Sequence, residues 1–438
     1  MEKVVLAFSG GLDTSFCVPY LKNEKGLEVH TVMVNTGGFT AEEAKRIEER
    51  ALSLGAKTHK TVDVVQEYYT KGIKYLIFGN ILKNSTYPLS VSSERIFQAL
   101  AVLEQVKEQG AQYVAHGSTG AGNDQVRFDL VFEVLAPEVK IIAPIRELQL
   151  SRKEEIDYLN EKGFSYSWEK AKYSINQGIW GTSVGGVETL SSSGVLPAEA
   201  YPSQITKTGS ERVKIGFEQG EPVSLNGQKM KPVDLIREIA KIANPYGIGR
   251  DIHVGDTIIG IKGRVGFEAA APLILIKAHH LLEKHVLTKS QLYWKEQLAN
   301  WYGQLMHEAQ YLDPVMRNIE AFLDDTQTTV SGEVEVELRP YSFSVLGCSS
   351  EFDLMSAKFG EYGEANNDKS SNRRWYRIYC RRTAQNFNKP SSDRNYIGYE
   401  YNKRRTAGSF CSQRAVWRVQ SQVYRYSGRT RCALSLSW

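Results

Sequence analysis

A glycine-rich turn near the N-terminus has the residue types that bind phosphate. Residues 7–15 read AFSGGLDTS and follow an apolar run, VVLAF at residues 4–8, so the turn connects an expected strand to an expected helix. Gly10 and Gly11 permit a tight turn in which backbone N–H groups approach a phosphate closely. The N-terminus of the following helix adds unpaired donors and about half a positive charge. The sequence therefore predicts a phosphate site at this turn.

The side chains of the same turn favour a nucleotide over a plain loop. Asp13 is placed to orient a metal ion or a donor, and three residues offer hydroxyl donors: Ser9, Thr14 and Ser15. The alternative is an ordinary strand-to-helix turn in which Asp13 caps the helix. The string lacks the Lys-Ser/Thr ending of a Walker loop and the third glycine of a dinucleotide fingerprint. It is similar to the pyrophosphate-binding loop of ATP-dependent adenylating enzymes, which implies that ATP is cleaved between its α and β phosphates.

A second polar segment follows a later strand. Residues 115–129 read AHGSTGAGNDQVRFD and come after YVAHG at residues 113–117. Because the carboxyl ends of parallel strands meet at one edge of a sheet, we expect this segment beside the phosphate turn. An arginine suits a carboxylate and an aspartate suits an ammonium group, so the segment fits a zwitterionic amino acid. The alternative is a surface turn with solvated charges.

The elements that position these segments alternate between strand and helix. Strands are expected at 4–8, 29–35, 57–64, 113–117 and 140–145, and helices at 14–22, 41–55 and 93–110. This alternation predicts an α/β domain with a mostly parallel sheet and helices on both faces. From about residue 167 the pattern becomes α+β, with strands expected at 212–217, 257–263 and 333–341 and helices at 233–243 and 272–287. We expect domains at 1–166 and 167–365, followed by a basic, irregular tail at 366–438.

Several separate segments together resemble one enzyme family. They are the 115–129 segment, TYPLSVSSER at 86–95, KYSINQGIWGTS at 172–183, NPYGIGR at 244–250 and ELRPYSF at 337–343. In their order and spacing they resemble argininosuccinate synthase over about residues 1–365. The resemblance implies an adenine nucleotide alpha hydrolase-like domain followed by a synthetase and multimerisation domain. It also implies a C–N ligase of arginine biosynthesis, which joins L-citrulline and L-aspartate through a citrulline adenylate and releases argininosuccinate, AMP and pyrophosphate.

The resemblance also implies the residues that contact each substrate. ATP, which would enter with Mg²⁺, would contact Ala7, Phe8, Ser9, Gly10, Gly11, Leu12, Asp13, Thr14, Ser15, Val34 and Gly117. Aspartate would contact Thr119, Asn123 and Asp124. Citrulline would contact Tyr87, Ser92, Asn123, Arg127, Ser174 and Ser183. No covalent nucleophile and no set of protein metal ligands is assigned, and the candidates for a catalytic role are Asp13 and Asp124.

Two positions depart from the family pattern. The family commonly places a glutamate and a tyrosine of the second domain on citrulline. Counted from the GIGR turn, these positions fall on Gly255, beside Asp256, and on Phe267, beside Glu268. Phe267 cannot donate a hydrogen bond. Asp256 would substitute for the glutamate after a small backbone shift, but the favoured interpretation of Asp256 and Glu268 is that they are ordinary loop charges.

The tail differs from the rest of the chain in composition. From residue 367 onward there are 13 Arg and 3 Lys against 3 acidic residues, although the whole chain has a net charge of only +4. Three of the five cysteines also lie there. A frameshifted reading of the gene explains this change better than RNA binding by arginines and aromatic residues does. The homotetramer that the resemblance implies is therefore in question.

Composition sets the remaining expectations. The 42% hydrophobic and 24% charged residues are ordinary for a soluble globular protein, and no stretch reaches the roughly 18–20 apolar residues of a membrane span. A cytoplasmic location is expected, with nucleic acid an unfavoured partner. The alternative function is another pyrophosphate-loop enzyme, such as a tRNA-thiolating one. That chemistry needs reactive cysteines, and the first 347 residues contain only Cys17.

Overall fold

The computed structural model describes residues 1–120, 122–164, 166 and 173–355. A five-stranded parallel sheet forms its first part, with strand order β3-β2-β1-β4-β5. The strands are β1 (Lys3–Ala7), β2 (Glu28–Asn35), β3 (Thr58–Asp63), β4 (Tyr113–Ala115) and β5 (Lys140–Ile142). All five agree with the sequence analysis, although β5 ends before Pro144, which begins the next helix. The order reverses between β1 and β4, which is where sheets of this kind bind ligands.

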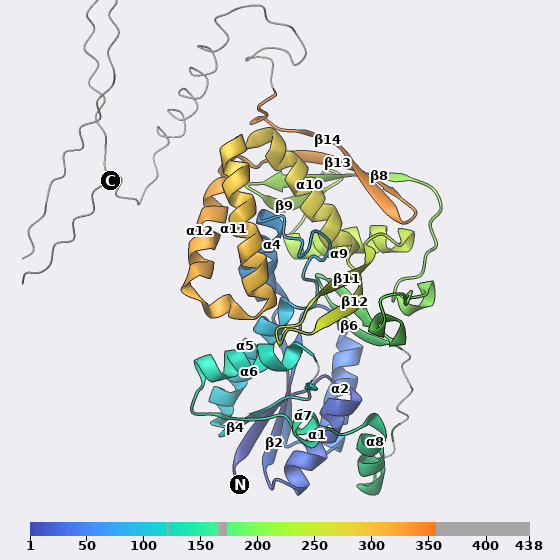
Figure 1. The fold of residues 1–438 in the computed structure, drawn as a ribbon, viewed down its shortest axis with the longest axis vertical. Helices are drawn as coiled ribbons and strands as arrows, with labels where there is room; N and C mark the ends of the chain where they lie inside the picture. The colour runs from blue at the N-terminus through green and yellow to red at the C-terminus, as the bar shows by residue number, and fades with distance from the viewer. Residues whose placement is uncertain (121, 165, 167–172, 356–438) are drawn as a thin grey trace, which may run out of the picture. The chain divides into compact units, whose positions relative to one another are not determined.

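Helices cover both faces of this sheet (Figure 1). On one side lie α5 (Glu94–Gln109) and α6 (Asp124–Leu135), and on the other lie α1 (Leu12–Asn23), α2 (Ala41–Ser53) and α8 (Arg152–Glu161). Successive residues of β1 alternate between the two faces, so that Val5 packs in one apolar cluster while Val4 and Leu6 pack in the other. Burial on both faces explains why the strand is apolar from Val4 to Ala7. The predicted fold class is confirmed.

Two antiparallel sheets form the second part. One has the order β10-β9-β8-β13-β14 and the other β11-β12-β7-β6. Their strands are β6 (Ser174–Gly178), β7 (Gly181–Gly185), β8 (Glu211–Glu218), β9 (Glu221–Leu225), β10 (Gln228–Lys229), β11 (Arg250–Asp256), β12 (Lys262–Glu268), β13 (Gly332–Arg339) and β14 (Ser342–Ser349). The helices that pack with them are α9 (Pro232–Ala243), α10 (Ala270–Val286), α11 (Lys289–His307) and α12 (Pro314–Thr326).

One expected strand is wrong. The run TIIGIKG at 257–263 was expected to be extended, but it contains the turn between β11 and β12. The N–H of Thr257 donates to the carbonyl of Ile261 at 2.7 Å, and Gly260 has φ +86°. A positive φ is unfavourable for residues other than glycine, so Gly260 fixes the turn within an apolar run. Ile259 and Ile261 are accordingly exposed.

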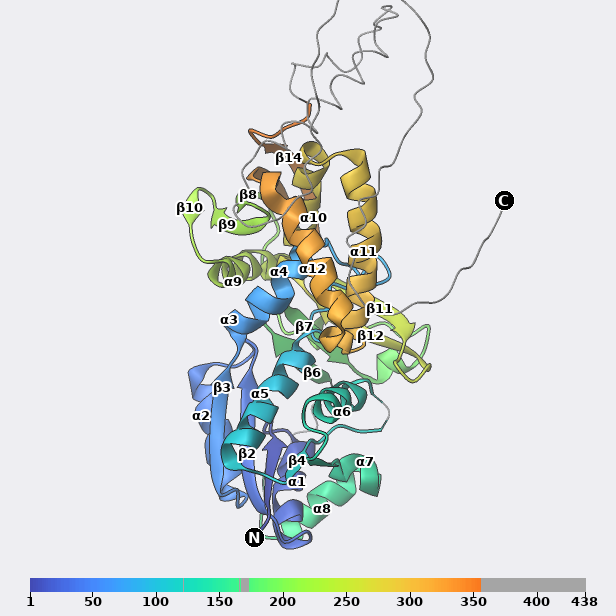
Figure 2. The same cartoon turned by 90° about the vertical axis from the view of Figure 1, so that its left-hand side faces the viewer.

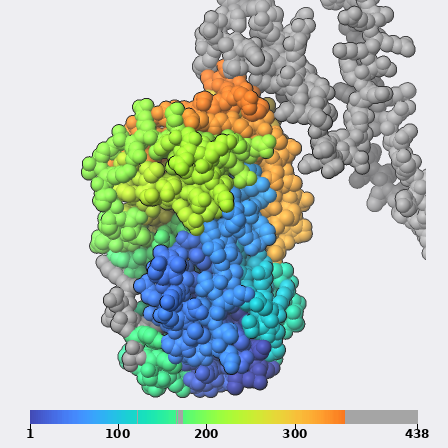
Figure 3. Space-filling model, turned by 180° about the vertical axis from the view of Figure 1, so that it is seen from behind, coloured from blue at the N-terminus to red at the C-terminus, as the bar shows by residue number. Residues whose placement is uncertain are grey.

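A segment of the first domain packs deeply in the second part. It comprises α3 (Val65–Tyr68), a π-helical turn (Tyr69–Ile73) and α4 (Lys74–Phe78). Figure 2 shows α4 beside α9, α10 and α12, and Figure 3 shows this blue segment rising between the green and orange regions. The Phe78 ring stacks on His279 of α10 at 6.1 Å between centroids. One apolar cluster therefore holds residues of both parts, and the domain boundary at 166 stays a prediction.

Residues 356–438 lie outside the described residues, and with them lie the predictions about the basic tail. Among the helices of the described residues, none is both long enough and apolar enough to cross a membrane.

Candidate active site

A cavity of about 1070 Å³ lies where the carboxyl ends of β1 and β4 meet the second part. Ser9 of the phosphate turn and Arg127 of the second polar segment both line it, so the two segments share one pocket as expected. Predicted site residues that line this pocket are Ala7, Phe8, Ser9, Gly11, Leu12, Asp13, Thr14, Val34, Tyr87, Ser92, Gly117, Thr119, Asn123, Asp124, Arg127, Ser174 and Ser183. Two predicted residues, Gly10 and Ser15, do not line it.

The phosphate turn is held in place by its own contacts. Gly10 has φ +76°, and a Cβ there would lie 3.0 Å from the Ile47 side chain of α2. Arg50 of the same helix donates to the Gly10 carbonyl at 2.5 Å. Helix α1 begins at Leu12 with no side-chain cap, so its first N–H groups remain available to an anion.

The hydroxyl groups of this turn differ in what they can reach. The Ser9 and Thr14 hydroxyls lie 3.3 Å apart at the edge of the pocket. The Ser15 hydroxyl is fully buried and has no hydrogen-bonding partner among the described residues. Of the three hydroxyl groups expected to donate to phosphate, only those of Ser9 and Thr14 therefore lie in residues that line the pocket.

The loop after β4 passes very close to the first turn of α1. A Cβ built on Gly117 would lie 3.0 Å from the Thr14 side chain and 3.3 Å from the Thr14 backbone nitrogen. His116, the residue before it, bonds through Nε2 to Asp129 at 2.9 Å and accepts the Ser118 N–H at 3.2 Å through Nδ1. These contacts make His116 an anchor of the loop after β4, and Gly117 the residue that permits its close approach.

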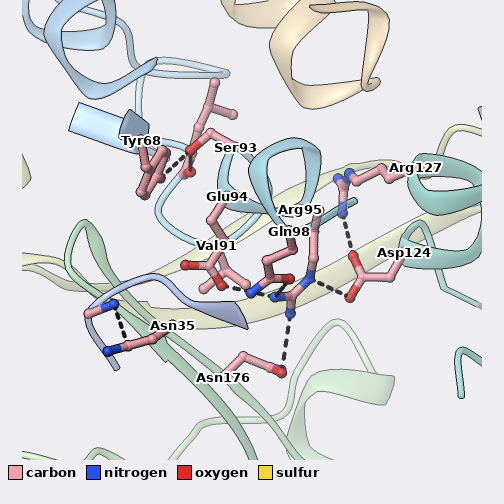
Figure 4. A network of polar contacts seen from close by, with 12 residues as sticks. Asn35, Tyr68, Val91, Ser93, Glu94, Arg95, Gln98, Asp124, Arg127 and Asn176 are labelled. Carbon is pink, nitrogen blue, oxygen red and sulfur yellow. Dashed lines mark hydrogen bonds and ion pairs between the residues drawn. The ribbon is translucent and has the colours of Figure 1, made fainter. Parts of the chain in front are cut away.

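A network centred on Arg95 joins the two parts of the fold (Figure 4). The Arg95 guanidinium donates to Glu94 at 2.9 Å, Asp124 at 3.0 Å and Asn176 at 3.2 Å. Asp124 also accepts from Arg127 at 2.8 Å. Arg95 therefore ties the start of α5 to the second polar segment and to strand β6 of the second part.

The charges in this network set the protonation of its carboxyl groups. Burial would raise the pKa of Asp124, but the guanidinium groups of Arg95 and Arg127 outweigh burial and lower this pKa to about 2. Asp124 is therefore a carboxylate at every physiological pH. Burial raises the pKa of Glu94 to about 7, although Arg95 opposes the shift. The second oxygen of Glu94 has no hydrogen-bonding partner among the described residues.

The second part closes the pocket with β6, β7, β11 and β12. Ser174 and Ser183, the two predicted serines, lie on the paired strands β6 and β7. Phe267 of β12 pairs with Ser183, is fully buried and packs on the Tyr87 ring at 5.3 Å between centroids. Phe267 does not line the pocket. At the position where the family has a tyrosine, this side chain packs against Tyr87 and offers no polar group to a ligand.

Asp256 and Glu268, the two acidic residues beside the positions that depart from the family pattern, have different surroundings. Glu268 is a buried strand residue that binds Arg250 at 2.8 Å, so its interpretation as a loop charge is wrong. Asp256 lies at the end of β11 with 62% of its side chain exposed, pairs with Lys262 at 2.6 Å and lines the pocket.

Several pocket residues were not named by sequence reasoning. They are Glu94, Arg95, Arg152, Asn176, His253 and His307. The charged pair Glu94–Arg95 opens an apolar helix, which is a usable signal because its neighbours Ser92 and Ser93 are also polar. His253 and His307 come from β11 and from the end of α11, and no spacing in the sequence connects these residues.

A buried carboxyl group beneath the phosphate turn predicts a pH effect on stability. Glu155 of α8 is 3% exposed, and burial followed by the charge of Asp13 raises its pKa from 4.5 to about 8. The folded protein thus holds this proton more tightly than the unfolded chain, so the contribution of Glu155 to stability falls as pH rises from about 4.5 to about 8.

Glu155→Gln is therefore expected to raise the melting temperature at pH 8 and to leave it nearly unchanged at pH 4.5. Melting curves without nucleotide at both pH values measure this, and Glu161→Gln at the exposed end of the same helix is the matched control. Equal shifts at the two pH values would show that Glu155 does not titrate in this range.

The chain matches known proteins along nearly all of its described length. Residues 3–165 match the model of the arginosuccinate synthase N-terminal HUP domain, and residues 173–380 match that of the C-terminal domain. The second match runs past residue 365, where the sequence analysis ended its resemblance. Argininosuccinate synthase of Methanocaldococcus jannaschii is 40% identical over 84% of this chain and 94% of its own length. The enzymes of Dictyoglomus thermophilum and Xanthomonas campestris pv. campestris are each 38% identical, over 84% and 83% of this chain and 92% of their own lengths.

Proposed function

This chain belongs to the argininosuccinate synthase family, and from that premise we propose how its pocket joins citrulline to aspartate at the expense of ATP. The chain is an ATP-dependent ligase of arginine biosynthesis. The observation that carries the assignment of the site is that Ser9 and Arg127, from the two predicted binding segments, line one cavity. The pocket therefore has a phosphate end and an amino-acid end.

The phosphate turn is the proposed ATP site. The free N–H groups of the first turn of α1 and the hydroxyls of Ser9 and Thr14 are donors for the phosphates. Arg152 of α8 also lines the pocket and adds positive charge near Asp13. Mg²⁺ bound by ATP usually needs only one or two protein carboxylates, so Asp13 fits this role. The ion would neutralise phosphate charge as pyrophosphate leaves.

Asp124 and its neighbours are the proposed aspartate site. Asp124 remains ionised between two guanidinium groups and presents a carboxylate to the ammonium group of aspartate. The Asn123 side-chain oxygen accepts the Ile258 N–H at 2.8 Å, which fixes the residue and leaves its NH₂ group for a carboxylate. Thr119 lines the pocket beside them.

Citrulline is placed between these two sites. Tyr87, Ser92 and Arg127 from the first part of the fold and Ser174 and Ser183 from the second all line the pocket. In the proposed reaction the ureido oxygen of citrulline attacks the α-phosphorus of ATP and pyrophosphate leaves. The amine of aspartate then attacks the ureido carbon of the adenylate and AMP leaves. Holding three substrates in line supplies most of the rate gain, because no covalent intermediate with the protein is required.

The release of AMP tests this proposal. With ATP and Mg²⁺ present, we expect AMP only when citrulline and aspartate are supplied together, and argininosuccinate in equal amount. AMP release with either amino acid alone, or none with both, would contradict it. The matches described above do not support the tRNA-thiolating alternative, and within the described residues neither Cys17 nor Cys348 lines the pocket. The involvement of Mg²⁺, the homotetramer and the cytoplasmic location stay predictions.

A further inference from the structure

Two buried imidazoles lie in the wall of the pocket without a role in the scheme above. His253 of β11 is 7% exposed and His307 at the end of α11 is 5% exposed, and both line the pocket. The His253 ring stacks on Tyr87 at 4.8 Å between centroids and meets the His307 ring edge-on at 6.2 Å. In the described part of the chain, the Nδ1 atom of each ring is buried and has no hydrogen-bonding partner. Buried polar atoms without partners are unusual and call for an explanation.

Both rings are neutral. Burial, and then the positive charge of Lys83, lower the pKa of His253 to about 4. Burial, and then Arg127 and Lys83, lower the pKa of His307 to about 2. Each ring therefore has one N–H donor and one acceptor nitrogen. A buried lone pair without a partner is less costly than a buried N–H without one, which favours the proton of His253 on Nε2.

The Nε2 atom of His253 has room because residue 255 is a glycine. A Cβ built on Gly255 would lie 2.8 Å from His253 Nε2, and Gly255 itself lines the pocket. Gly263, the opposite position on β12, also lines the pocket, but a Cβ there would meet only a Thr257 methyl group at 3.9 Å and not the His253 ring. The imidazole N–H thus occupies space that any side chain at 255 would take.

The surroundings of this donor favour a negatively charged group. Arg127 donates through Nε to the His307 carbonyl at 3.0 Å and through Nη1 to Asp124, which places its guanidinium at the end of α11, where its charge acts on the His307 ring. Lys83 adds a second positive charge and is held by Gln304. The two acids that act on Lys83 are engaged: Glu308 accepts from Gln304, and Asp256 binds Lys262. An ammonium group would meet two cations here, whereas a carboxylate would meet donors.

We propose that His253 binds substrate, its imidazole N–H and Arg127 together holding the α-carboxylate of citrulline, and that Gly255 is required because it leaves space for this ring. The inference rests on the proposed function and adds to it a residue that sets which end of the substrate is recognised. His307 positions Arg127 through its backbone carbonyl. The α-ammonium of citrulline contributes little at this corner.

Two analogues of citrulline test the recognition. Citrullinamide replaces the α-carboxylate with a carboxamide, and 5-ureidopentanoate lacks the α-amino group. The calorimetric Kd of the wild-type chain is expected to rise on the order of 100-fold for citrullinamide and by less than about tenfold for 5-ureidopentanoate. His253→Leu is expected to weaken citrulline binding by about 10- to 100-fold while leaving citrullinamide binding unchanged, so that the discrimination collapses.

Matched variants separate this role from a structural one. Gly255→Ala is expected to reduce discrimination in the same direction as His253→Leu, whereas Gly263→Ala keeps the wild-type ratio. His253→Asn, which keeps a donor, is expected to restore part of the discrimination. The inference would be overturned if His253→Leu left the ratio of the Kd for citrullinamide to the Kd for citrulline unchanged. It would also be overturned if the wild-type chain bound citrullinamide tightly and failed to bind 5-ureidopentanoate. The calorimetric Kd does not depend on turnover. A chain that releases no AMP would therefore contradict the proposed function, while the binding data would still show whether His253 recognises the α-carboxylate.

Discussion

Replacing Arg95 with methionine is expected to abolish measurable ligation and to destabilise the fold by about 1–3 kcal/mol, because Glu94 and Asp124 lose a donor in a buried site. Arg95 is 9% exposed and Glu94 is 1% exposed as side chains, so neither charge can turn to solvent. Without the guanidinium, Asp124 also loses one of the two donors that fix it, and Asn176 loses its tie to the first domain. Loss of alignment among the substrates costs on the order of 100-fold or more in rate.

A double variant separates the two effects of this change. Glu94→Gln combined with Arg95→Met removes the carboxyl group that has lost its partner, so denaturant unfolding is expected to show part of the stability restored while AMP release stays lost. Arg212→Met is the control, because this arginine has 61% of its side chain exposed and its ion pairs with Glu335 and Glu337 lie outside the pocket lining. If the double variant regained activity together with stability, Arg95 would serve folding alone and the placement of Asp124 would not depend on it.

The sequence predicted the first domain well because its physical signals are local. Strand β1 is apolar from Val4 to Ala7 since both of its faces are buried, and Gly10 with φ +76° marks the turn after it. The error at 257–263 shows where local signals fail. Isoleucine favours strands, yet a single glycine with positive φ decides the turn, and sequence alone does not state the sign of φ.

The site was predictable only where one segment contributes several residues. Residues 115–129 supply Asn123, Asp124 and Arg127 within a few positions, so their chemistry could be seen in the string. His253 and His307 meet because β11 and the end of α11 converge, and neither residue has a polar partner that would mark it. Asn176 joins Arg95 across 81 residues in the same way. Contacts of this kind depend on tertiary packing and have no sequence period.

Gly117→Ala is expected to raise the KM for ATP by about 10- to 100-fold with a smaller change in the KM for aspartate, because one added carbon pushes on the phosphate turn and not on Asp124. The added Cβ would lie 3.0 Å from the Thr14 methyl group, 3.3 Å from the Thr14 nitrogen and 3.4 Å from the Asp13 carbonyl carbon. Two of these three atoms are backbone, so rotation of a side chain cannot relieve the contact. The first turn of α1 must shift, and it is the proposed source of the N–H donors for the phosphates.

Gly122→Ala is the matched control for this prediction, since a Cβ at that position has nothing within 4 Å. Both glycines belong to the same loop after β4, so a general loss of loop flexibility would affect the two variants alike. A KM for ATP raised in Gly117→Ala alone would therefore assign the effect to the contact with Thr14. Equal KM values for ATP in the two variants would mean that α1 can shift without cost. In that case the close approach of the loop after β4 to α1 would not determine how the phosphates are held.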